Sequence, residues 1–555
     1  MDTLRFYFVT WNVATKSPGQ DLNSLLDFPS QFNRNKPLPD FYVIGLQEVK
    51  SAPQNMVMDS LFTDPWTSTF NKILCRQGFI IAKTIRLQGI ILIVYTQLKH
   101  VTHLRDIEAQ YTKIGFGGLW GNKGAVSVRF NIYGCSVCLV NCHLTAHEHL
   151  HHHRVTDYNT IVNNHTYHVT ETTHILFHDY VFFIGDLNCR LDHPPDESPS
   201  AEEIAAALQE VEKDKYAALL KYDQLYASQE LDEAFVELTE PEIRFPPTYK
   251  FILGTDDYDL KRKPSWTDRI LYKVVPNNYE NITLRADCLS YNDVPHYTVS
   301  DHKPVVAVYT IKVQRLLTRS LMADVPRATR SMIRMRTALV KPADTPEDEA
   351  GTSTPDVPEG EEEEEDVCDN VDGVFVSDEV MANYTEKTVE FAPVVRIWYI
   401  GDADFRTQCT LSPDVEINPN DWIGIYDADF HNLDDYIAYE YLAKVSLPHD
   451  SPESGQARTI TLSFPVGSGV RTPGFYRFIY FSQPNNEVRS VLGISDPFEV
   501  CSKEDALVTI DPCEQASTSS SSGKPTTATT DLFTDFTGLD VTKLSRHFSN
   551  DLSID

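Results

Sequence analysis

An acid and an amide, Asp186 and Asn188, stand two residues apart just after the apolar run from Tyr180 to Ile184. The run is typical of a buried strand, and it stops at Gly185. A carboxylate at a strand end can take a proton from water, and a neighbouring amide can hold an oxyanion or a metal-bound oxygen. An Asp-x-Asn pair after a strand is by itself most often a capped turn. The chemical interpretation therefore depends on whether the same layout recurs along the chain.

The layout does recur. Apolar runs at residues 5–10, 41–46 and 136–140 lead to Asn12, Glu48 and His143, while Asp301 and His302 precede the predicted strand 304–310, and Asp268 adds a further acid. Strand ends converge at one rim of a sheet or sandwich, so we expect these side chains to meet there. The alternative, that they are unrelated turn residues, would explain one acid but not the repetition.

The chemical types in this set predict a metal site. Carboxylates dominate it and thiolates are absent, which suits one hard divalent cation with oxygen ligands, beside an Asp–His pair and a group of phosphate-holding residues. For the same reason Mg²⁺ is favoured over zinc.

Length, net charge and cysteine content limit the classes of protein to which this chain can belong. A chain of 555 residues is long enough for about two or three domains. Its formal net charge of -32 makes it a poor general binder of nucleic acid. We expect no signal peptide after Met1 and no bilayer-spanning run. The ten scattered cysteines indicate a cytosolic protein with reduced thiols, and Cys135 and Cys138, within one strand pattern, are expected to be buried structural residues.

Seven segments in order make the pattern specific. They are Trp11-Asn12-Val13, Leu46-Gln47-Glu48-Val49, Gly121-Asn122-Lys123-Gly124, Asn141-Cys142-His143-Leu144, Gly185-Asp186-Leu187-Asn188-Cys189-Arg190, Pro264-Ser265-Trp266-Thr267-Asp268-Arg269-Ile270 and Ser300-Asp301-His302-Lys303-Pro304. Over residues 1–313 this order resembles the inositol polyphosphate 5-phosphatases. The resemblance implies an α+β chain with the DNase-I-like endonuclease/exonuclease/phosphatase fold, a four-layer αββα sandwich. Thr267 is often Cys in relatives and Cys189 is often aromatic, and neither side chain is expected to do chemistry.

The resemblance also implies roles for the site residues. Glu48 is expected to ligate Mg²⁺ with Asn12 nearby, and Asp186 to orient or deprotonate the attacking water. His143 and Asn188 are expected to hold the scissile phosphate, and His302 to stabilise the developing charge. Asp268 is expected to orient His302, with Asp301 close to the metal.

Cations near the Trp266 motif are expected to choose the substrate. In the family the matching stretches grip the 4-phosphate of the inositol ring, which we carry over to Tyr249, Lys250 and Arg262. Lys261 and Lys263 join this set less firmly because the spacing of the loop varies, and Lys123 is expected to contact the 1-phosphate. The alternative is a solvated basic loop.

Two other stretches have competing interpretations. Phe116, Leu119 and Trp120 stand on a Gly-rich loop that either enters a bilayer edge or packs on its own domain. The seven residues 147–153 contain five histidines, which invites a metal interpretation. Successive positions point around a helix instead of converging, so a solvated helix face is expected.

A second helix is predicted from about Ala201 to Lys221, capped by Ser200.

The remaining chain divides by composition. Residues 314–372 read as a linker, first basic and then acidic, either a flexible tether or, in its basic half, an amphipathic segment for anionic membrane. Short alternating runs predict a β-sandwich over residues 373–502. Its segments Asp421-Trp422-Ile423-Gly424-Ile425-Tyr426 and Ser495-Asp496-Pro497-Phe498 resemble the SKICH domain, an immunoglobulin-like module. Residues 503–555 read as a disordered Ser/Thr-rich tail.

The prediction from sequence is a Mg²⁺-dependent phosphatase that removes the 5-phosphate of phosphatidylinositol 4,5-bisphosphate and 3,4,5-trisphosphate, and also acts on soluble inositol polyphosphates. One alternative is a nuclease of the same superfamily, and the other is a lipid-binding scaffold without turnover. Phosphoinositide lipids in membranes are the expected partners, together with a protein that binds the SKICH domain. Nucleic acid is not expected as a partner. The protein is expected to be a cytoplasmic monomer at the periphery of the plasma membrane or endoplasmic reticulum.

Overall fold

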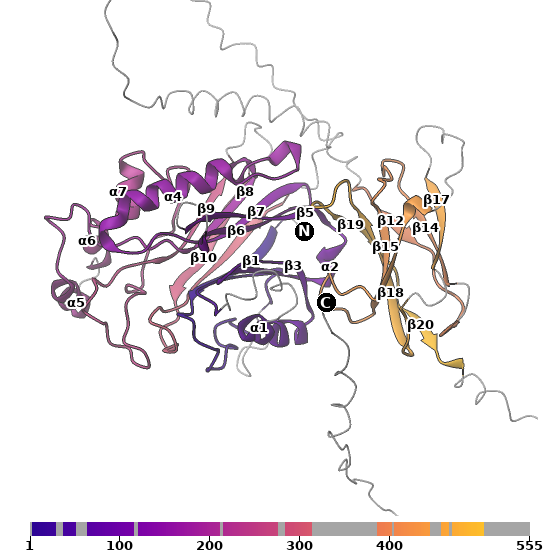
Figure 1. The fold of residues 1–555 in the computed structure, drawn as a ribbon, viewed down its shortest axis with the longest axis horizontal. Coiled ribbons are helices and arrows are strands. Elements are labelled where there is room, and N and C mark those ends of the chain that lie inside the picture. The colour runs from indigo at the N-terminus through magenta and orange to yellow at the C-terminus, as the bar shows by residue number, and fades with distance from the viewer. Residues whose placement is uncertain are drawn as a thin grey trace, which may run out of the picture. The chain divides into compact units, whose positions relative to one another are not determined.

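Two β-sheets packed face to face form the N-terminal part of the computed structural model (Figure 1). The structure describes residues 3–28, 37–50, 64–115, 120–210, 215–275, 284–313, 386–401, 405–444, 457–464 and 469–503. The first sheet has the order β10-β11-β1-β2-β4-β3. Its strands are β1 Thr3–Asn12, β2 Phe41–Gln47, β3 Phe79–Leu87, β4 Ile90–Gln97, β10 Ala286–Asp293 and β11 Val305–Lys312.

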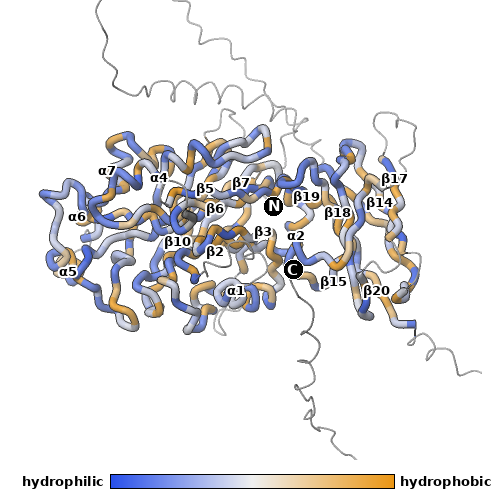
Figure 2. The backbone as a smooth tube through the Cα atoms, in the orientation of Figure 1, coloured by the Kyte–Doolittle hydropathy of each residue, from blue (hydrophilic) through white to orange (hydrophobic). Residues whose placement is uncertain are grey.

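The second sheet has the order β5-β6-β7-β8-β9. Its strands are β5 Leu104–Ile114, β6 Trp120–Ile132, β7 Cys135–His143, β8 Tyr180–Asp186 and β9 Asp268–Val274. One buried hydrophobic cluster joins the inner faces of the two sheets, with Phe8 and Val43 from the first sheet and Val128, Leu139 and Phe182 from the second. Figure 2 shows hydrophobic stretches along these interior strands.

Helices cover the outer faces of both sheets. Helix α1, Pro65–Arg76, packs Trp66, Phe70 and Leu74 against the first sheet. Helix α4, His151–Asn164, packs Tyr158 and Ile161 against the second. In Figure 1 α1 lies on one side of the paired sheets and α4 on the other. The four layers agree with the predicted αββα sandwich, which is confirmed.

Parallel strand pairing brings together the strand ends that carry the predicted site residues. Strands β1 and β2 run parallel with Asn12 opposite Gln47, and β7 and β8 run parallel with His143 opposite Asp186. Gly185 permits the close approach of β7 and β8: at its φ of 142°, an added Cβ would lie 2.1 Å from the carbonyl oxygen of Cys142. Glycine is the residue that tolerates this conformation without a clash.

The helix predictions were partly right. The histidine-rich stretch begins with a short 3-10 turn, Glu148–Leu150, before α4. Ser200 caps the next helix, as predicted, and the structure shows that it does so through a complete capping box with Glu203. The prediction of one helix up to Lys221 was wrong, because α5, Ala201–Gln209, ends where Glu210 becomes extended at ψ 151°. Two shorter helices follow, α6 Lys215–Leu220 and α7 Gln224–Glu230; α2, Leu98–Val101, is a single turn.

The C-terminal part forms a separate β-sandwich core. Strands β12 Val389–Phe391, β14 Phe405–Leu411 and β17 Arg458–Phe464 make one sheet. The other sheet has the order β13-β20-β18-β15-β16, with β19 paired to β18; its strands are β13 Trp398–Tyr399, β15 Trp422–Asp427, β16 Ala438–Tyr441, β18 Gly474–Ser482, β19 Ser490–Ile494 and β20 Phe498–Cys501. Side chains of both sheets, including Leu411 and Phe478, share one cluster, so the predicted sandwich is confirmed.

Several predictions concern residues outside the described ranges. They concern the basic and acidic linker, almost all of the Ser/Thr-rich tail, and the side chains of Phe116, Leu119 and Trp120. The domain boundaries also stay predictions. Cys135 and Cys138 are both buried and belong to different clusters on opposite faces of β7, which confirms their structural role. Within the described helices, none is both long and apolar enough to cross a membrane.

Candidate active site

Asp186 lies at the centre of the rim where the strand ends meet. Its Oδ2 atom accepts a hydrogen bond from Asn12 Nδ2 at 2.9 Å, and its Oδ1 atom accepts one from the backbone N–H of Asn188 at 3.0 Å. His143 Nε2 lies 3.3 Å from Asp186 Oδ2. These predicted residues, from β1, β7 and β8, therefore form one connected group around a buried carboxylate.

A second group is the predicted Asp–His pair. His302 Nδ1 lies 2.8 Å from Asp268 Oδ2, and the hydroxyls of Thr248 and Thr267 donate to the same oxygen at 2.7 Å and 2.9 Å. The other face of the imidazole is directed to the centre of the site, because His302 Nε2 is 4.0 Å from Asp186 Oδ2. Asp268 thus fixes the orientation of a histidine that faces the reacting group.

The charges of the site follow from this geometry. Burial alone would lower the pKa of His302, but the carboxylates of Asp268, Asp186 and Asp301 outweigh it and raise the pKa to about 9. Burial would raise the pKa of Asp186, but the hydrogen bond with His143 and the nearby charges of His302 and Lys123 hold it well below its usual range. At neutral pH the site therefore pairs an ionised Asp186 with an imidazolium at His302.

This charge state predicts a pH dependence of stability. Because the pKa of folded His302 is raised from 6.5 to about 9, its stabilising contribution is complete below pH 6.5 and is lost as the pH rises through 9. We expect the free energy of unfolding to decline over this window more steeply in the wild type than in Asp268→Asn, which lacks the carboxylate that raises this pKa. Urea unfolding at a series of pH values measures both slopes, and equal slopes would contradict the assigned charge state.

Lys123, whose contact with the 1-phosphate stays a prediction, is part of the group of residues around His143. Its Nζ contacts His143 Nε2, and its charge acts on Asp186 and Glu48. Burial lowers the pKa of Lys123 to about 8, and burial together with Lys123 lowers the pKa of His143. The structure thus places Lys123 in the catalytic centre, where an ammonium can neutralise phosphoryl charge.

Asn188 is held by a residue that the sequence reasoning did not select. Arg190 Nη2 donates to Asn188 Oδ1 at 2.6 Å, and Asn188 Nδ2 donates to the carbonyl oxygen of Leu144 at 3.1 Å. The Arg190 guanidinium also stacks 4.4 Å from the ring centre of Tyr249. Its Nη1 atom is buried and has no hydrogen-bond partner within the described ranges. Arg190 is the last residue of the Asp186 motif, and its place in that motif is the sequence signal for this role.

The donors near Glu48 fit a hard divalent cation. Glu48 adopts a φ of 55°, and its side chain is 42% exposed. His143 Nε2 lies 3.8 Å from Glu48 Oε1. An accessible carboxylate suits Mg²⁺, which prefers oxygen ligands and retains water, while the side-chain oxygen of Asn12 accepts a hydrogen bond from the backbone N–H of Ala14 at 3.0 Å. Asp186, Asp268 and His302 also approach one another within metal-binding distance among the described residues. The assignment of Glu48 as the metal ligand, with Asn12 nearby, stays a prediction.

The predicted substrate cations have different surroundings. Lys250 Nζ lies 3.6 Å from Asp301 Oδ2, so Asp301 faces this lysine. Lys261 and Arg262 are exposed. Lys263 Nζ is instead bonded to Asp192 at 2.6 Å and to Ser198 at 2.7 Å, so its ammonium is engaged away from the rim.

Sequence reasoning missed the supporting residues around the Asp–His pair. Thr267 was expected to do no chemistry, and its hydroxyl supports the pair as a hydrogen-bond donor to Asp268. Thr248 makes the same contact. Trp11 Nε1 donates to the carbonyl oxygen of His302 at 3.0 Å, and Ser300 Oγ donates to that of Asn12 at 2.6 Å. Each belongs to a recognised motif or adjoins one, but only contacts between distant segments reveal its use.

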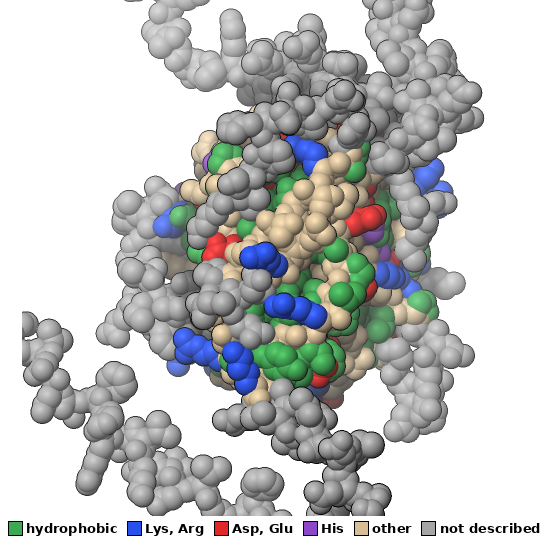
Figure 3. Space-filling model, turned by 90° about the vertical axis from the view of Figure 1, so that its right-hand side faces the viewer, with side chains coloured by type: hydrophobic (Ala, Val, Ile, Leu, Met, Phe, Trp, Pro, Cys, Tyr) green, Lys and Arg blue, Asp and Glu red, His purple; other side chains and the backbone are tan. Residues whose placement is uncertain are grey.

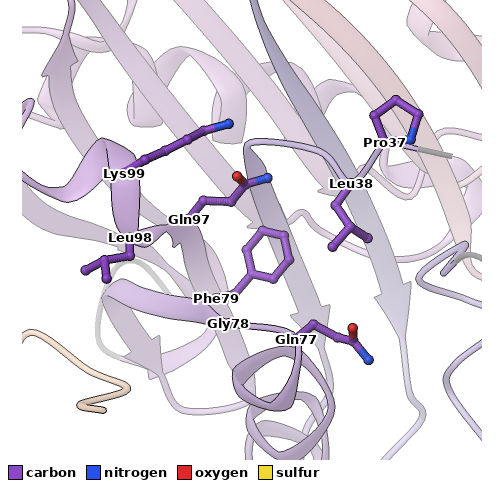
Figure 4. Close-up of a pocket in the computed structure, with 8 residues that line it drawn as sticks. All are labelled: Pro37, Leu38, Gln77, Gly78, Phe79, Gln97, Leu98 and Lys99. Atoms are coloured by element: carbon purple, nitrogen blue, oxygen red, sulfur yellow. The ribbon is translucent and has the colours of Figure 1, made fainter. Parts of the chain in front are cut away.

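A separate surface pocket of about 540 Å³ is lined by Pro37, Leu38, Gln77, Gly78, Phe79, Gln97, Leu98 and Lys99 (Figure 4). None of these residues belongs to the predicted catalytic set, so the pocket is not the site of the chemistry. On the face in Figure 3, Lys and Arg side chains are scattered among hydrophobic and other side chains. On this face the described residues form no continuous basic stripe of the kind that binds nucleic acid.

Comparisons with known proteins identify the family of this chain. The Endonuclease/Exonuclease/phosphatase family 2 matches residues 9–308, and the SKICH domain matches residues 389–500. Inositol polyphosphate 5-phosphatase K of Mus musculus is 27% identical over 515 residues, which cover 90% of this chain and 90% of that protein. Phosphatidylinositol 4,5-bisphosphate 5-phosphatase A of Homo sapiens is 31% identical over 509 residues, 89% of this chain but 41% of that protein.

Phosphatidylinositol 4,5-bisphosphate 5-phosphatase A of Mus musculus is 37% identical to this chain over 318 residues. The match spans only 31% of the length of that protein. Among solved structures, the inositol polyphosphate 5-phosphatase domain of SPsynaptojanin, in complex with inositol (1,4)-bisphosphate and calcium ion, has a TM-score of 0.46 and 28% identity, over 60% of this chain and 93% of that one. The relatives of this chain are inositol polyphosphate 5-phosphatases, and a SKICH domain follows the catalytic part. Because the family model matches more than half of its residues, the chain belongs to the endonuclease/exonuclease/phosphatase family 2.

Proposed function

We propose that this chain is a Mg²⁺-dependent phosphatase that removes the 5-phosphate of phosphatidylinositol 4,5-bisphosphate and 3,4,5-trisphosphate, with soluble inositol polyphosphates as secondary substrates. The observation that carries the proposal is the buried Asp186 carboxylate, bonded to Asn12 and Asn188 and facing the Asp268–His302 pair. The names of the relatives support the 5-phosphate as the group removed.

The residues divide the work of hydrolysis among themselves. Asp186 stays ionised because its pKa is low, so it can accept a hydrogen bond from the attacking water and orient it. His143, Asn188 and Lys123 hold the oxygens of the scissile phosphate, and protonated His302 stabilises the charge that develops. Mg²⁺ held by Glu48 and Asn12 would neutralise phosphoryl charge as a Lewis acid. Water attacks in line, the bond from phosphorus to the inositol oxygen breaks, and no covalent enzyme intermediate is needed.

Two alternatives lead to different expectations. A nuclease of the same superfamily would share the Asp-x-Asn and Asp–His groups, but the net charge of -32 opposes DNA binding. A scaffold without turnover would not need the complete set of Glu48, His143, Asp186 and His302. Salt-sensitive DNA binding would support the first alternative, and lipid binding without turnover would support the second.

The proposed location follows from the proposed substrate. A phosphatase acting on phosphoinositides works at the cytoplasmic periphery of a membrane, the plasma membrane or the endoplasmic reticulum. We propose a monomer that has phosphoinositide lipids and a protein bound by its SKICH domain as partners, and no nucleic acid.

Phosphate release from short-chain lipids tests the proposal. We expect Mg²⁺-dependent release from the 4,5-bisphosphate and the 3,4,5-trisphosphate but not from the 4-monophosphate, which lacks the 5-phosphate, with Asp186→Ala as the blank. Release from all three would indicate a phosphatase without 5-specificity. No release from any of them, by folded protein that still binds lipid in EDTA, would reject the enzyme and leave the scaffold.

A further inference from the structure

Strands β15 and β18 are apolar on both faces of the sheet that they form. We call the two N-terminal sheets the catalytic sandwich and the two C-terminal sheets the SKICH sandwich. Ile423, Phe478 and Tyr480 point into the core of the SKICH sandwich. Trp422 and Phe481, which pair across the two strands and alternate with these residues, are also buried, but in the cluster that fills the catalytic sandwich. The outer face of this sheet therefore packs against the catalytic sandwich.

An edge strand from each sheet of the catalytic sandwich bonds to the SKICH sandwich. Strand β3 is at the edge of the first sheet and β5 is at the edge of the second. Ile81 of β3 donates its N–H to the carbonyl oxygen of His431 at 2.8 Å and accepts a hydrogen bond from Leu433 N–H at 3.1 Å. Ile107 of β5 exchanges both backbone hydrogen bonds with Arg489, at 2.7 Å and 3.1 Å. Because unpaired edge groups attract strands of other molecules, these bonds protect both edges.

Irregularities in both edge strands fall at these contacts. The pairing of β3 with β4 shifts register between Ile81 and Lys83, and that of β5 with β6 shifts between Arg105 and Glu108. A bulge bends an edge strand and leaves a residue unpaired in its own ladder. Ile81 and Ile107 lie at the two shifts, where their N–H groups bond to the SKICH sandwich. The backbone of both edges thus fits this contact.

Polar side chains add to the apolar contact. Ser490 Oγ accepts a hydrogen bond from Asp106 N–H at 2.8 Å. The Arg105 guanidinium donates to the carbonyl oxygen of Val491 and, at 2.8 Å, to that of Lys387. An apolar centre together with satisfied polar groups is the arrangement of a specific protein interface.

The contact lies at the ends of the strands that are remote from the active site. In the first sheet, Ile81 is level with Tyr42 of β2, five residues before the rim end of that strand. In the second sheet, Ile107 lies beside the position that is level with Cys138 of β7, five residues before the rim end at His143. At about 3.3 Å a residue, each contact is about 17 Å from the rim along the strands. The contact therefore leaves the rim open.

We propose that the SKICH sandwich is a fixed cap on the two edge strands of the catalytic sandwich, and that the two form one structural unit with an open active site. The apolar outer face of β15 and β18 is thus reserved for the catalytic part of the same chain. Domains joined by a large apolar interface keep one arrangement, whereas domains joined by a tether alone move relative to each other. The inference does not depend on the proposed reaction.

An engineered disulfide tests the contact in the full chain. Asp106→Cys/Ser490→Cys places two thiols where Ser490 Oγ lies 2.8 Å from Asp106 N and 3.4 Å from Asp106 Oδ1, which is within reach of a disulfide. Asp106→Cys/Gln408→Cys is the matched control, because Gln408 is exposed on β14 in the other sheet of the SKICH sandwich. We expect mild oxidation to link the first pair within one chain and not the second, as measured by peptide mass mapping.

Hydrogen exchange tests the same contact in a variant that opens it. The amides of Ile81 and Ile107 bond to SKICH carbonyl oxygens, so their exchange rates report the contact directly. Leu433→Asp places a charge in the buried contact and is expected to speed both rates by about tenfold or more, while amides of β8 and β17 stay protected. Val395→Asp, at a position of the SKICH sandwich that is 96% exposed, should exchange as the wild type does.

Two results would overturn the proposal and leave the outer face of β15 and β18 to another protein. They are a folded Asp106→Cys/Ser490→Cys variant that does not link, and wild-type Ile81 and Ile107 amides that exchange as fast as exposed ones. Turnover of short-chain lipid by the linked variant is expected within about twofold of its reduced form, and a larger loss would refute the open active site. If the wild type shows no turnover, the proposed function has failed, whereas linking and hydrogen exchange still decide the contact.

Discussion

Asp186→Asn is expected to reduce 5-phosphate release by about 10³-fold or more while the protein stays folded. The substitution removes the negative charge that orients water and faces His302, yet it preserves the shape of the side chain. An amide has one oxygen and one NH₂ group, so it cannot accept hydrogen bonds both from Asn12 Nδ2 and from Asn188 N–H, as the carboxylate does. We therefore also expect a loss of stability of about 1–3 kcal/mol.

Steady-state phosphate release and urea unfolding together check this prediction. Asp196→Asn is the matched control, because Asp196 is an exposed acid ten residues further along the chain and outside the site. The control should retain wild-type activity and stability. If Asp186→Asn keeps turnover within about tenfold of the wild type, Asp186 does not have the assigned role.

Glu48→Gln is expected to weaken the response to Mg²⁺ by about 10- to 100-fold, the range found when the support of a metal site is altered. The amide retains an oxygen ligand but removes the charge that attracts a hard divalent cation. Turnover should therefore fall at low Mg²⁺ and recover in part as Mg²⁺ is raised. EDTA should abolish turnover in the wild type.

A titration of turnover against Mg²⁺ measures this shift directly. Glu202→Gln, on the exposed side of α5, changes the same charge away from the site and should leave the midpoint unchanged. An unchanged midpoint in Glu48→Gln, with a lower maximal rate, would assign Glu48 to substrate binding or to the fold instead of to the metal.

Local patterns in the sequence predicted the elements that carry a continuous apolar run or a capping residue. The apolar run of β8 and the Ser200 capping box are read from neighbouring residues and appear in the structure. The break at Glu210 was missed because its extended backbone has no strong local signal: Glu is a good helix former, and no proline or glycine follows it directly. Strands β3 and β5 were also missed, since each includes charged residues that interrupt a simple alternation.

The sequence by itself determined the chemical types of the catalytic groups and the order in which strand ends deliver them. The order of its motifs implied the fold through the resemblance to the 5-phosphatases, and its short alternating runs predicted the β-sandwich that follows. Tertiary structure alone decided how these groups work together. Parallel pairing of β7 and β8 sets His143 beside Asp186, the Asp268 carboxylate sets the charge of His302, and burial brings Lys123 into the centre. The tertiary structure also bonds the Lys263 ammonium to the Asp192 carboxylate and leaves the side chains of Ile252 and Leu253 exposed. Burial, pKa and contact depend on segments far apart in the chain, and local sequence does not contain that information.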